Sequence, residues 1–134
     1  MAQIANLVVL DRPGTAHTFS PFTKDANGVY ELREPTGVPL ADAKCTLSAR
    51  TNASGKYIVK GKFTIPVTQT QTINGVSSPV VVRTAYGEVT LTFDAASSKV
   101  ERSSAARYVS GLLDLTENNW VWDKVIGDAS GIYG

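Results

Sequence analysis

The sequence has very few of the side chains on which most enzymes and metal sites depend. Its 134 residues include one cysteine, Cys45, and one histidine, His17. A single cysteine excludes an internal disulfide, and without a CxxC or HxxxH spacing there is no pattern for a metal site. A Ser–His–Asp or Cys–His arrangement would have to use His17, so we expect no catalytic residues, no metal, no cofactor and no enzyme activity. Cys45 is expected to be a small hydrophobic core residue.

Long apolar runs and a basic leader segment are also missing. No run approaches the roughly 20 apolar residues that span a bilayer, and the N-terminus lacks the basic region of a secretory signal. Hydrophobic residues make up 43% and charged residues 19% of the chain, a balance that excludes a disordered protein. We expect one domain over residues 1–134, with no membrane partner.

What the sequence has in abundance is β-branched side chains. Val (15), Thr (14) and Ile (6) make up about a quarter of the chain, which favours strands. A turn signal over residues 11–14 closes a hairpin within residues 1–23, and Asn27-Gly28 is the strongest signal for a second tight turn. Residues 27–93 are then expected to form a sheet, with strands at 29–34, 43–50, 56–66 and 80–93 and loops at 34–42 and 69–79.

After Asp94 the apolar period changes from that of a strand to that of a helix. Ser98 followed three residues later by Glu101 is a capping box, and apolar residues then recur at helical spacing. Asn118 or Asn119 can cap a second, shorter helix that ends at Gly127. Two helices are therefore expected within residues 97–127, and strands followed by helices indicate an α+β fold.

Charge is unevenly distributed along the chain. Residues 44–87 carry six Lys or Arg and no Asp or Glu, although the net charge is only +1. Strict alternation puts cations and hydroxyls on one face of two successive strands. These side chains are Lys44, Thr46, Ser48, Arg50, Lys60, Lys62 and Thr64. With Tyr86 on the next strand as a stacking platform, they have the composition of a surface that reads single-stranded RNA. The alternative is an ordinary solvated face.

These strands, in this order, resemble the coat proteins of the small single-stranded RNA bacteriophages, the leviviruses, and most closely the male-specific, plasmid-dependent group. The resemblance spans nearly the whole chain and includes Asn27-Gly28-Val29, the alternating strand 44–50, the segment 71–79, Gly111-Leu112-Leu113 and the terminal segment 130–133. It implies an N-terminal β-hairpin, a five-stranded antiparallel sheet and two C-terminal helices. It also implies an interlocked dimer in which two sheets join into ten strands.

The resemblance further implies a viral capsid protein that is part of the virion. Such proteins dimerise, assemble into an icosahedral shell in the bacterial cytoplasm, and bind a hairpin of the single-stranded RNA genome. Binding represses translation of the replicase and marks the genome for packaging. Two alternatives remain open: a dimeric RNA-binding translational regulator that forms no shell, and a structural fibre or tail subunit that binds no RNA.

Three sets of residues follow from the resemblance. The RNA-binding set is Val29, Lys44, Thr46, Ser48, Arg50, Asn52, Lys60, Lys62, Tyr86 and Glu88. Within it, a pocket for an unpaired adenine is formed by Val29, Thr46, Ser48 and Lys62, while Tyr86 stacks on a base, and Lys44 and Arg50 meet phosphates. The capsid-contact loop is Gln71, Thr72, Asn74, Gly75, Val76 and Pro79. The dimer interface is anchored by Tyr108, Leu112, Trp120 and Trp122.

Two residues of the RNA-binding set depart from the family pattern. Lys60 stands where close relatives place Thr in the adenine pocket. Glu88 stands where they have Asn or a shorter acid. A carboxylate near phosphate is unfavourable unless it accepts a hydrogen bond from a base amine or a sugar hydroxyl.

Overall fold

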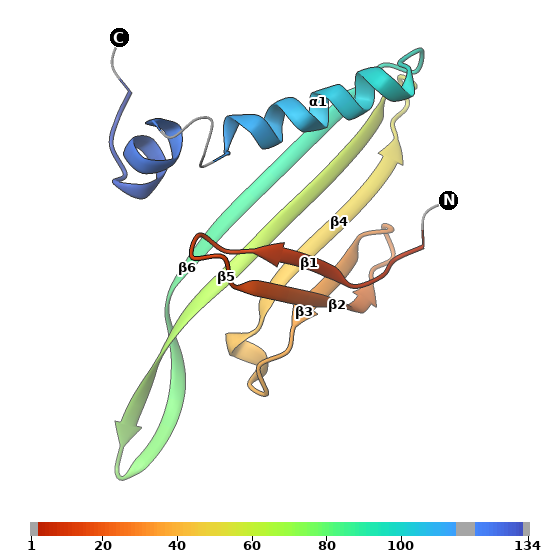
Figure 1. The fold of residues 1–134 in the computed structure, drawn as a ribbon. Helices are drawn as coiled ribbons and strands as arrows, with labels where there is room; N and C mark the ends of the chain where they lie inside the picture. Colours follow the sequence, from red (N-terminus) through yellow and green to blue (C-terminus); the bar gives the residue numbers. More distant parts are fainter. Residues whose placement is uncertain (1–2, 115–119, 133–134) are drawn as a thin grey trace. The chain divides into compact units, whose positions relative to one another are not determined.

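The computed structural model describes residues 3–114 and 120–132. Within those ranges it contains six strands, one main helix and two short helical segments (Figure 1). In chain order these are β1 (Leu7–Leu10), β2 (Ala16–Lys24), β3 (Tyr30–Glu34), η1 (Pro39–Ala41), β4 (Ala43–Thr51), β5 (Tyr57–Ile73), β6 (Val76–Phe93), α1 (Lys99–Leu112) and η2 (Trp120–Gly127). The chain divides into two compact units, Met1–Thr92 and Phe93–Gly134.

The strands of the first unit form a single sheet in the order of the chain, β1 to β6. The expected N-terminal hairpin is confirmed, because β1 pairs antiparallel with β2. β2 also pairs with β3, so the hairpin continues into the sheet. The five-stranded sheet implied by the resemblance is wrong, because β1 to β6 form one sheet of six strands. The four strands expected within residues 27–93 are present as β3 to β6, but β5 and β6 continue through most of the segment 69–79 that was expected to be a loop.

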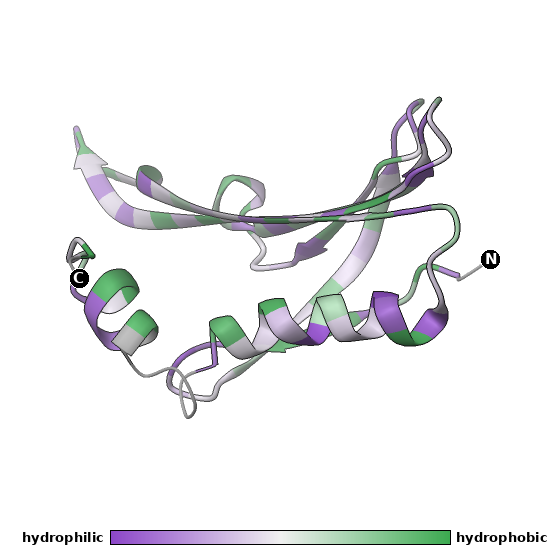
Figure 2. Ribbon diagram, turned by 90° about the horizontal axis from the view of Figure 1, so that it is seen from above, coloured by the Kyte–Doolittle hydropathy of each residue, from purple (hydrophilic) through white to green (hydrophobic). Residues whose placement is uncertain are grey.

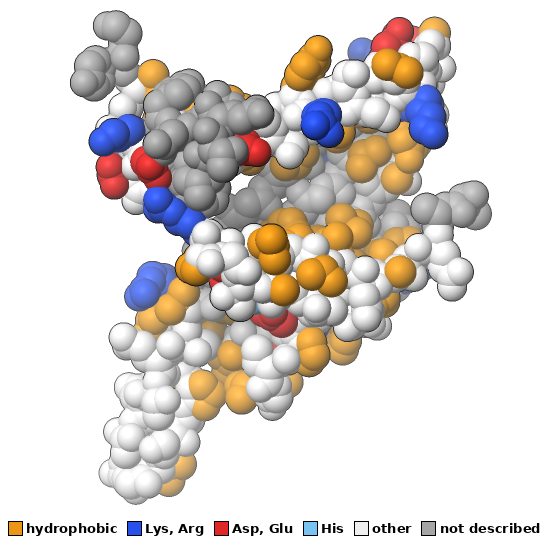
Figure 3. Space-filling view, viewed as in Figure 1, with side chains coloured by type: hydrophobic (Ala, Val, Ile, Leu, Met, Phe, Trp, Pro, Cys, Tyr) orange, Lys and Arg blue, Asp and Glu red, His pale blue; other side chains and the backbone are white. Residues whose placement is uncertain are grey.

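The long β5–β6 hairpin ends in a tight turn at Asn74-Gly75. Both residues have positive φ, +52° and +78°, as a two-residue turn matched to the twist of its strands requires. Beside the turn, the hydroxyls of Thr72 and Ser77 lie 3.1 Å apart and form a cross-strand hydrogen bond. Figure 3 shows no Lys, Arg, Asp or Glu at this end of the hairpin on the face in view. The pairing of β5 with β6 therefore extends to this turn.

The register of the central strands confirms the predicted apolar face. Cys45 lies opposite Leu32 on β3 and opposite Phe63 on β5, so all three side chains point to one side. Leu32 and Cys45 are fully buried, and the rings of Phe19 and Phe63 meet edge to face with centroids 5.5 Å apart. Figure 2 shows the alternation of hydrophobic and hydrophilic residues along these strands. The complete burial of Cys45 confirms it as a core residue, and this burial raises the pKa of its thiol.

The second unit begins with α1, whose start is the predicted capping box. The Ser98 hydroxyl accepts a hydrogen bond from the Glu101 backbone N–H, while the Glu101 carboxylate accepts one from the Ser98 N–H. The expectation of a second α-helix is wrong: η2 is a single eight-residue π-helical segment. So short a segment has little intrinsic helical stability. The cap expected at Asn118 or Asn119 lies outside the described residues.

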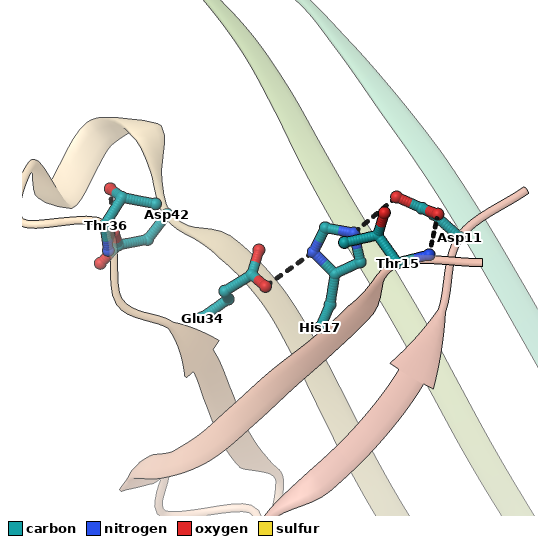
Figure 4. A network of polar contacts seen from close by, with 6 residues as sticks. All are labelled: Asp11, Thr15, His17, Glu34, Thr36 and Asp42. Carbon is teal, nitrogen blue, oxygen red and sulfur yellow. Dashed lines mark hydrogen bonds and ion pairs between the residues drawn. The ribbon is translucent and has the colours of Figure 1, made fainter. Parts of the chain in front are cut away.

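A polar network ties the β1–β2 turn to the end of β3 (Figure 4). The Nε2 atom of His17 lies 2.8 Å from an Asp11 carboxylate oxygen, and Nδ1 lies 2.7 Å from a Glu34 oxygen. The Asp11 carboxylate also accepts a hydrogen bond from the Thr15 backbone N–H. Because carboxylates occupy both ring nitrogens, neither is placed to take a proton from a nucleophile. The sole histidine is therefore a surface residue that links two strands.

This network makes stability depend on pH in a defined direction. The hydrogen bonds that the His17 ring donates to the carboxylates of Asp11 and then Glu34 raise the pKa of His17 above its ordinary value of 6.5, and His17 lowers the pKa of Asp11 below 3.8. The His17 contribution is complete below pH 6.5 and is lost as the pH rises through the raised pKa. The Asp11 contribution is present above pH 3.8 and is lost as the pH falls through the lowered pKa. Both contributions are present between about pH 4 and 6.5.

We therefore expect the wild-type Tm to fall relative to that of His17→Gln as the pH is raised from 5.5 to 8.5. Scanning calorimetry of both proteins at one protein concentration measures this difference. Comparison with the variant cancels the titration of all other groups. Parallel Tm profiles for the two proteins would contradict the assigned network.

Candidate nucleic-acid interface

The polar face of β4 and β5 is continuous, as the sequence predicted. Thr46 lies directly opposite Lys62, and Ser48 lies opposite Lys60. Directly paired residues of antiparallel strands point to the same side of the sheet, with Cβ atoms about 5 Å apart. Two hydroxyls and two ammonium groups are therefore gathered in one patch on the side away from Cys45.

Six side chains of the predicted RNA-binding set surround one cavity on this face. The cavity has a volume of about 170 Å³ and is lined by Val29, Thr46, Ser48, Lys60, Lys62 and Glu88. They come from the residue just before β3 and from β4, β5 and β6, so the cavity exists only because these four strands are neighbours. Its ammonium groups donate hydrogen bonds, its carboxylate accepts them and its hydroxyls can do both. Val29 adds an apolar wall.

Val29 is held in place by a residue that sequence reasoning missed. The Asp25 carboxylate accepts hydrogen bonds from the backbone N–H groups of Asn27, at 2.8 Å, and Val29, at 2.9 Å. This side chain orders the tight turn between β2 and β3 and so positions the wall of the cavity. The signal in the sequence is an Asp two residues before Asn-Gly, a pattern typical of an Asx turn.

Tyr86 lies beside the cavity and presents its ring to solvent. Its side chain is 68% exposed, and the Nζ atom of Lys62 lies 5.2 Å from the ring centroid. This distance is within the range of a cation–π interaction. Lys62 therefore both lines the cavity and contacts the Tyr86 ring, so a change at one of these two places is expected to affect the other.

The remaining members of the predicted set lie around the cavity. Lys44 and Arg50 are on the same face of β4, one at each end, opposite Thr64 and Ile58. Asn52 is in the β4–β5 turn, where its side-chain oxygen accepts hydrogen bonds from the backbone N–H groups of Ser54 and Lys56, each at 3.0 Å. Asn52 thus shapes the turn.

Two further charged residues share this face. Glu31 lies opposite Thr46 and Arg33 lies opposite Lys44. The Nε atom of Arg33 donates to a Glu31 carboxylate oxygen at 3.0 Å. Alternation in the expected strand 29–34 was the signal that could have found them, because every second residue of a strand points to the same side.

Residues 3–114 and 120–132 contain no group of three His, Cys, Asp or Glu side chains arranged to hold a metal ion. Among the same residues, no helix combines the length and the hydropathy that crossing a bilayer requires.

Comparison with known proteins identifies the family. The family model described as levivirus coat protein matches residues 2–133. The chain belongs to the levivirus coat protein family. The capsid protein of Pseudomonas phage PRR1 is 41% identical over 114 residues, which cover 84% of this chain and 86% of that protein. The coat protein is accordingly a structural capsid protein of a levi-like phage, located in the virion, and not an enzyme.

Two solved structures show the same architecture. The capsid protein of bacteriophage GA matches with a TM-score of 0.83 and 27% identity, covering 99% of this chain and 100% of that chain. An unassembled virus coat protein dimer, described as a bacteriophage RNA-binding dimer, matches with a TM-score of 0.70 and 20% identity over 99% of this chain and 100% of that chain. The second likeness concerns the fold alone.

The other predicted residues of the coat protein divide into two groups. Gln71, Thr72, Asn74, Gly75, Val76 and Pro79 are exposed at the β5–β6 end, where all but the turn residues Asn74 and Gly75 belong to strands. On α1, Tyr108 is 78% exposed and Leu112 is 53% exposed. The side chains of Trp120 and Trp122 lie outside the described residues.

Proposed function

We propose that the coat protein binds a hairpin of its single-stranded RNA genome on the polar face of the sheet, and that binding represses replicase translation and marks the genome for packaging. The cavity carries this proposal, because six residues expected to contact RNA surround one space. It rests on a sheet whose residues 44–87 hold six cations and no carboxylate.

Each group of the site has a role that its chemistry supports. The hydroxyls of Thr46 and Ser48 hydrogen-bond the edge of an unpaired base, since a single-stranded loop exposes those edges. Lys60 and Lys62 neutralise phosphates beside it. The Glu88 carboxylate, which can only accept hydrogen bonds, selects a base with an exocyclic amine such as adenine.

We further propose that two copies form an interlocked dimer. None of the 14 residues of α1 is buried, and isolated helices of about this length are marginal in water. Tyr108 and Leu112 therefore need a covering surface, which a second copy provides. The unassembled dimer with the same fold supports this arrangement.

Dimers then assemble into an icosahedral shell in the bacterial cytoplasm, with the β5–β6 end as a contact between dimers. Its residues 69–79 carry no charge, so that bringing copies together buries no unpaired ion. The tight turn at Asn74-Gly75 is a point where the end can change its direction, because glycine tolerates many backbone conformations.

The first experiment combines electron microscopy with RNA selection. Recombinant protein is imaged and its 260/280 nm absorbance ratio is measured after nuclease treatment. The same protein is used to select hairpins from a library with a randomised loop. We expect uniform shells that protect nucleic acid, and selected loops that share an unpaired adenine.

Each other outcome would contradict a particular part of the proposal. Dimers that bind hairpins but never form shells would favour a translational regulator. Shells or fibres free of nucleic acid, together with no enrichment of any loop, would favour a purely structural subunit. Enrichment of loops without an unpaired amine-bearing base would contradict the role given to Glu88.

A further inference from the structure

The aromatic side chain of Phe22 lies at a position where the regular pairing of β2 with β3 is interrupted. In the β2–β3 ladder, Pro21 lies opposite Leu32 and Thr23 lies opposite Glu31, so Phe22 is the extra residue of a β-bulge. Bulges commonly redirect a side chain next to a functional site. Phe22 is 57% exposed, whereas a ring placed only for packing would be covered.

The face to which Phe22 points follows from its contact with Arg33. The guanidinium carbon of Arg33 lies over the Phe22 ring, 3.9 Å from the ring centroid, within the range of a cation–π interaction. Arg33 is opposite Lys44, and Glu31, its ion-pair partner, is opposite Thr46 of the cavity. The stacked pair therefore extends the polar face from the cavity outward across β3 to β2.

We propose that Phe22 and Arg33 form a second stacking platform, which binds unpaired nucleotides of single-stranded RNA flanking the hairpin. This inference rests on the proposed function, because the hairpin in the cavity brings the flanking strand to the platform. A base stacks on the exposed Phe22 ring, and Lys44, which lies opposite Arg33, supplies a cation for the adjoining phosphate.

The Glu31–Arg33 pair fixes the platform and limits its selectivity. An N–H···O contact of 3.0 Å to the carboxylate holds the guanidinium in one plane over the ring. Stacking then accepts any base, since every base has an aromatic face. The platform therefore adds affinity for single-stranded RNA without reading its sequence, unlike the cavity.

The test compares two RNAs on three proteins. The first RNA is a hairpin selected on the wild-type protein, and the second is the same hairpin with ten unpaired nucleotides of mixed A and C at each end. Filter binding or fluorescence anisotropy gives Kd at fixed salt. For the wild type we expect the extension to tighten binding about fivefold or more. Phe22→Leu should abolish this gain and bind the short hairpin normally, whereas Phe22→Tyr, which keeps the ring, should retain it.

The outcomes separate this inference from the proposed function. An equal gain from the extension in wild type and Phe22→Leu would overturn the platform, and so would no gain in the wild type. A wild-type protein that binds neither RNA would instead contradict the hairpin proposal itself. Size-exclusion chromatography checks that both Phe22 variants have the oligomeric state of the wild type. If Phe22→Leu fails this check, the platform is tested with Arg33→Leu and its conservative partner Arg33→Lys.

Discussion

Leu32→Ala is expected to lower the free energy of unfolding by about 2–5 kcal/mol, the largest stability effect of any single change proposed for this chain. Leu32 is fully buried at the centre of a small cluster with Phe19, Ala43 and Cys45. Truncation leaves a cavity in a core with few other buried side chains to close around it. Urea denaturation followed by tryptophan fluorescence measures the change, at one fixed protein concentration because the proposed dimer would link folding to concentration.

The matched control for this variant is Leu40→Ala. Leu40 lies in the short helix η1 and is 47% exposed, so the same chemical change should cost well under 1 kcal/mol. Equal losses in the two variants would mean that the cluster around Leu32 is not the core of the folded protein.

Tyr86→Ala is expected to weaken hairpin binding by about 1–3 kcal/mol, roughly 5- to 150-fold in Kd, through loss of base stacking. Lys62→Ala should weaken it by a similar amount, about 1–3 kcal/mol, and leave dimers intact. Because Lys62 lies over the Tyr86 ring, the two losses should not add. Kd values from wild type, both single variants and the double variant give a coupling energy of about 0.5–1 kcal/mol.

Two controls distinguish contact with RNA from a general disturbance of the sheet. Tyr86→Phe keeps the ring and should bind almost as well as wild type. Tyr57 pairs with Thr51 and, by alternation, points to the other side of β5 from Lys60 and Lys62, so Tyr57→Ala should leave hairpin affinity unchanged. Full binding by Tyr86→Ala would remove Tyr86 from the site, and strict additivity with Lys62→Ala would contradict the coupling.

The central strands could be predicted from the sequence because their two faces differ in chemistry. Alternation of Lys44, Thr46 and Ser48 with Cys45 and Leu47 fixes both the strand and its orientation. The strand ends could not be predicted in the same way. Residues 69–79 are polar but uncharged on both sides, so no period of two marks them as strand. Pairing between β5 and β6 decides their structure.

The same reasoning explains which parts of the site were missed. The place of Glu31 and Arg33 depends on the register of β3 against β4, which pairs them with Thr46 and Lys44. The position of Phe22 depends on a bulge, and a bulge exists only relative to a partner strand. Features of this kind arise from pairing between distant segments, and local sequence patterns do not record them.

The uncovered helix α1 has a consequence for the timing of infection. If a chain folds stably only as part of a dimer, the concentration of folded dimer at low expression rises with the square of the chain concentration. At low concentration the coat protein would then be mostly monomeric and would not repress replicase translation. Repression would begin once enough chains had accumulated to form dimers. If dimerisation and repression occur as proposed, the need of α1 for a partner would thus delay the change from copying the genome to packaging it.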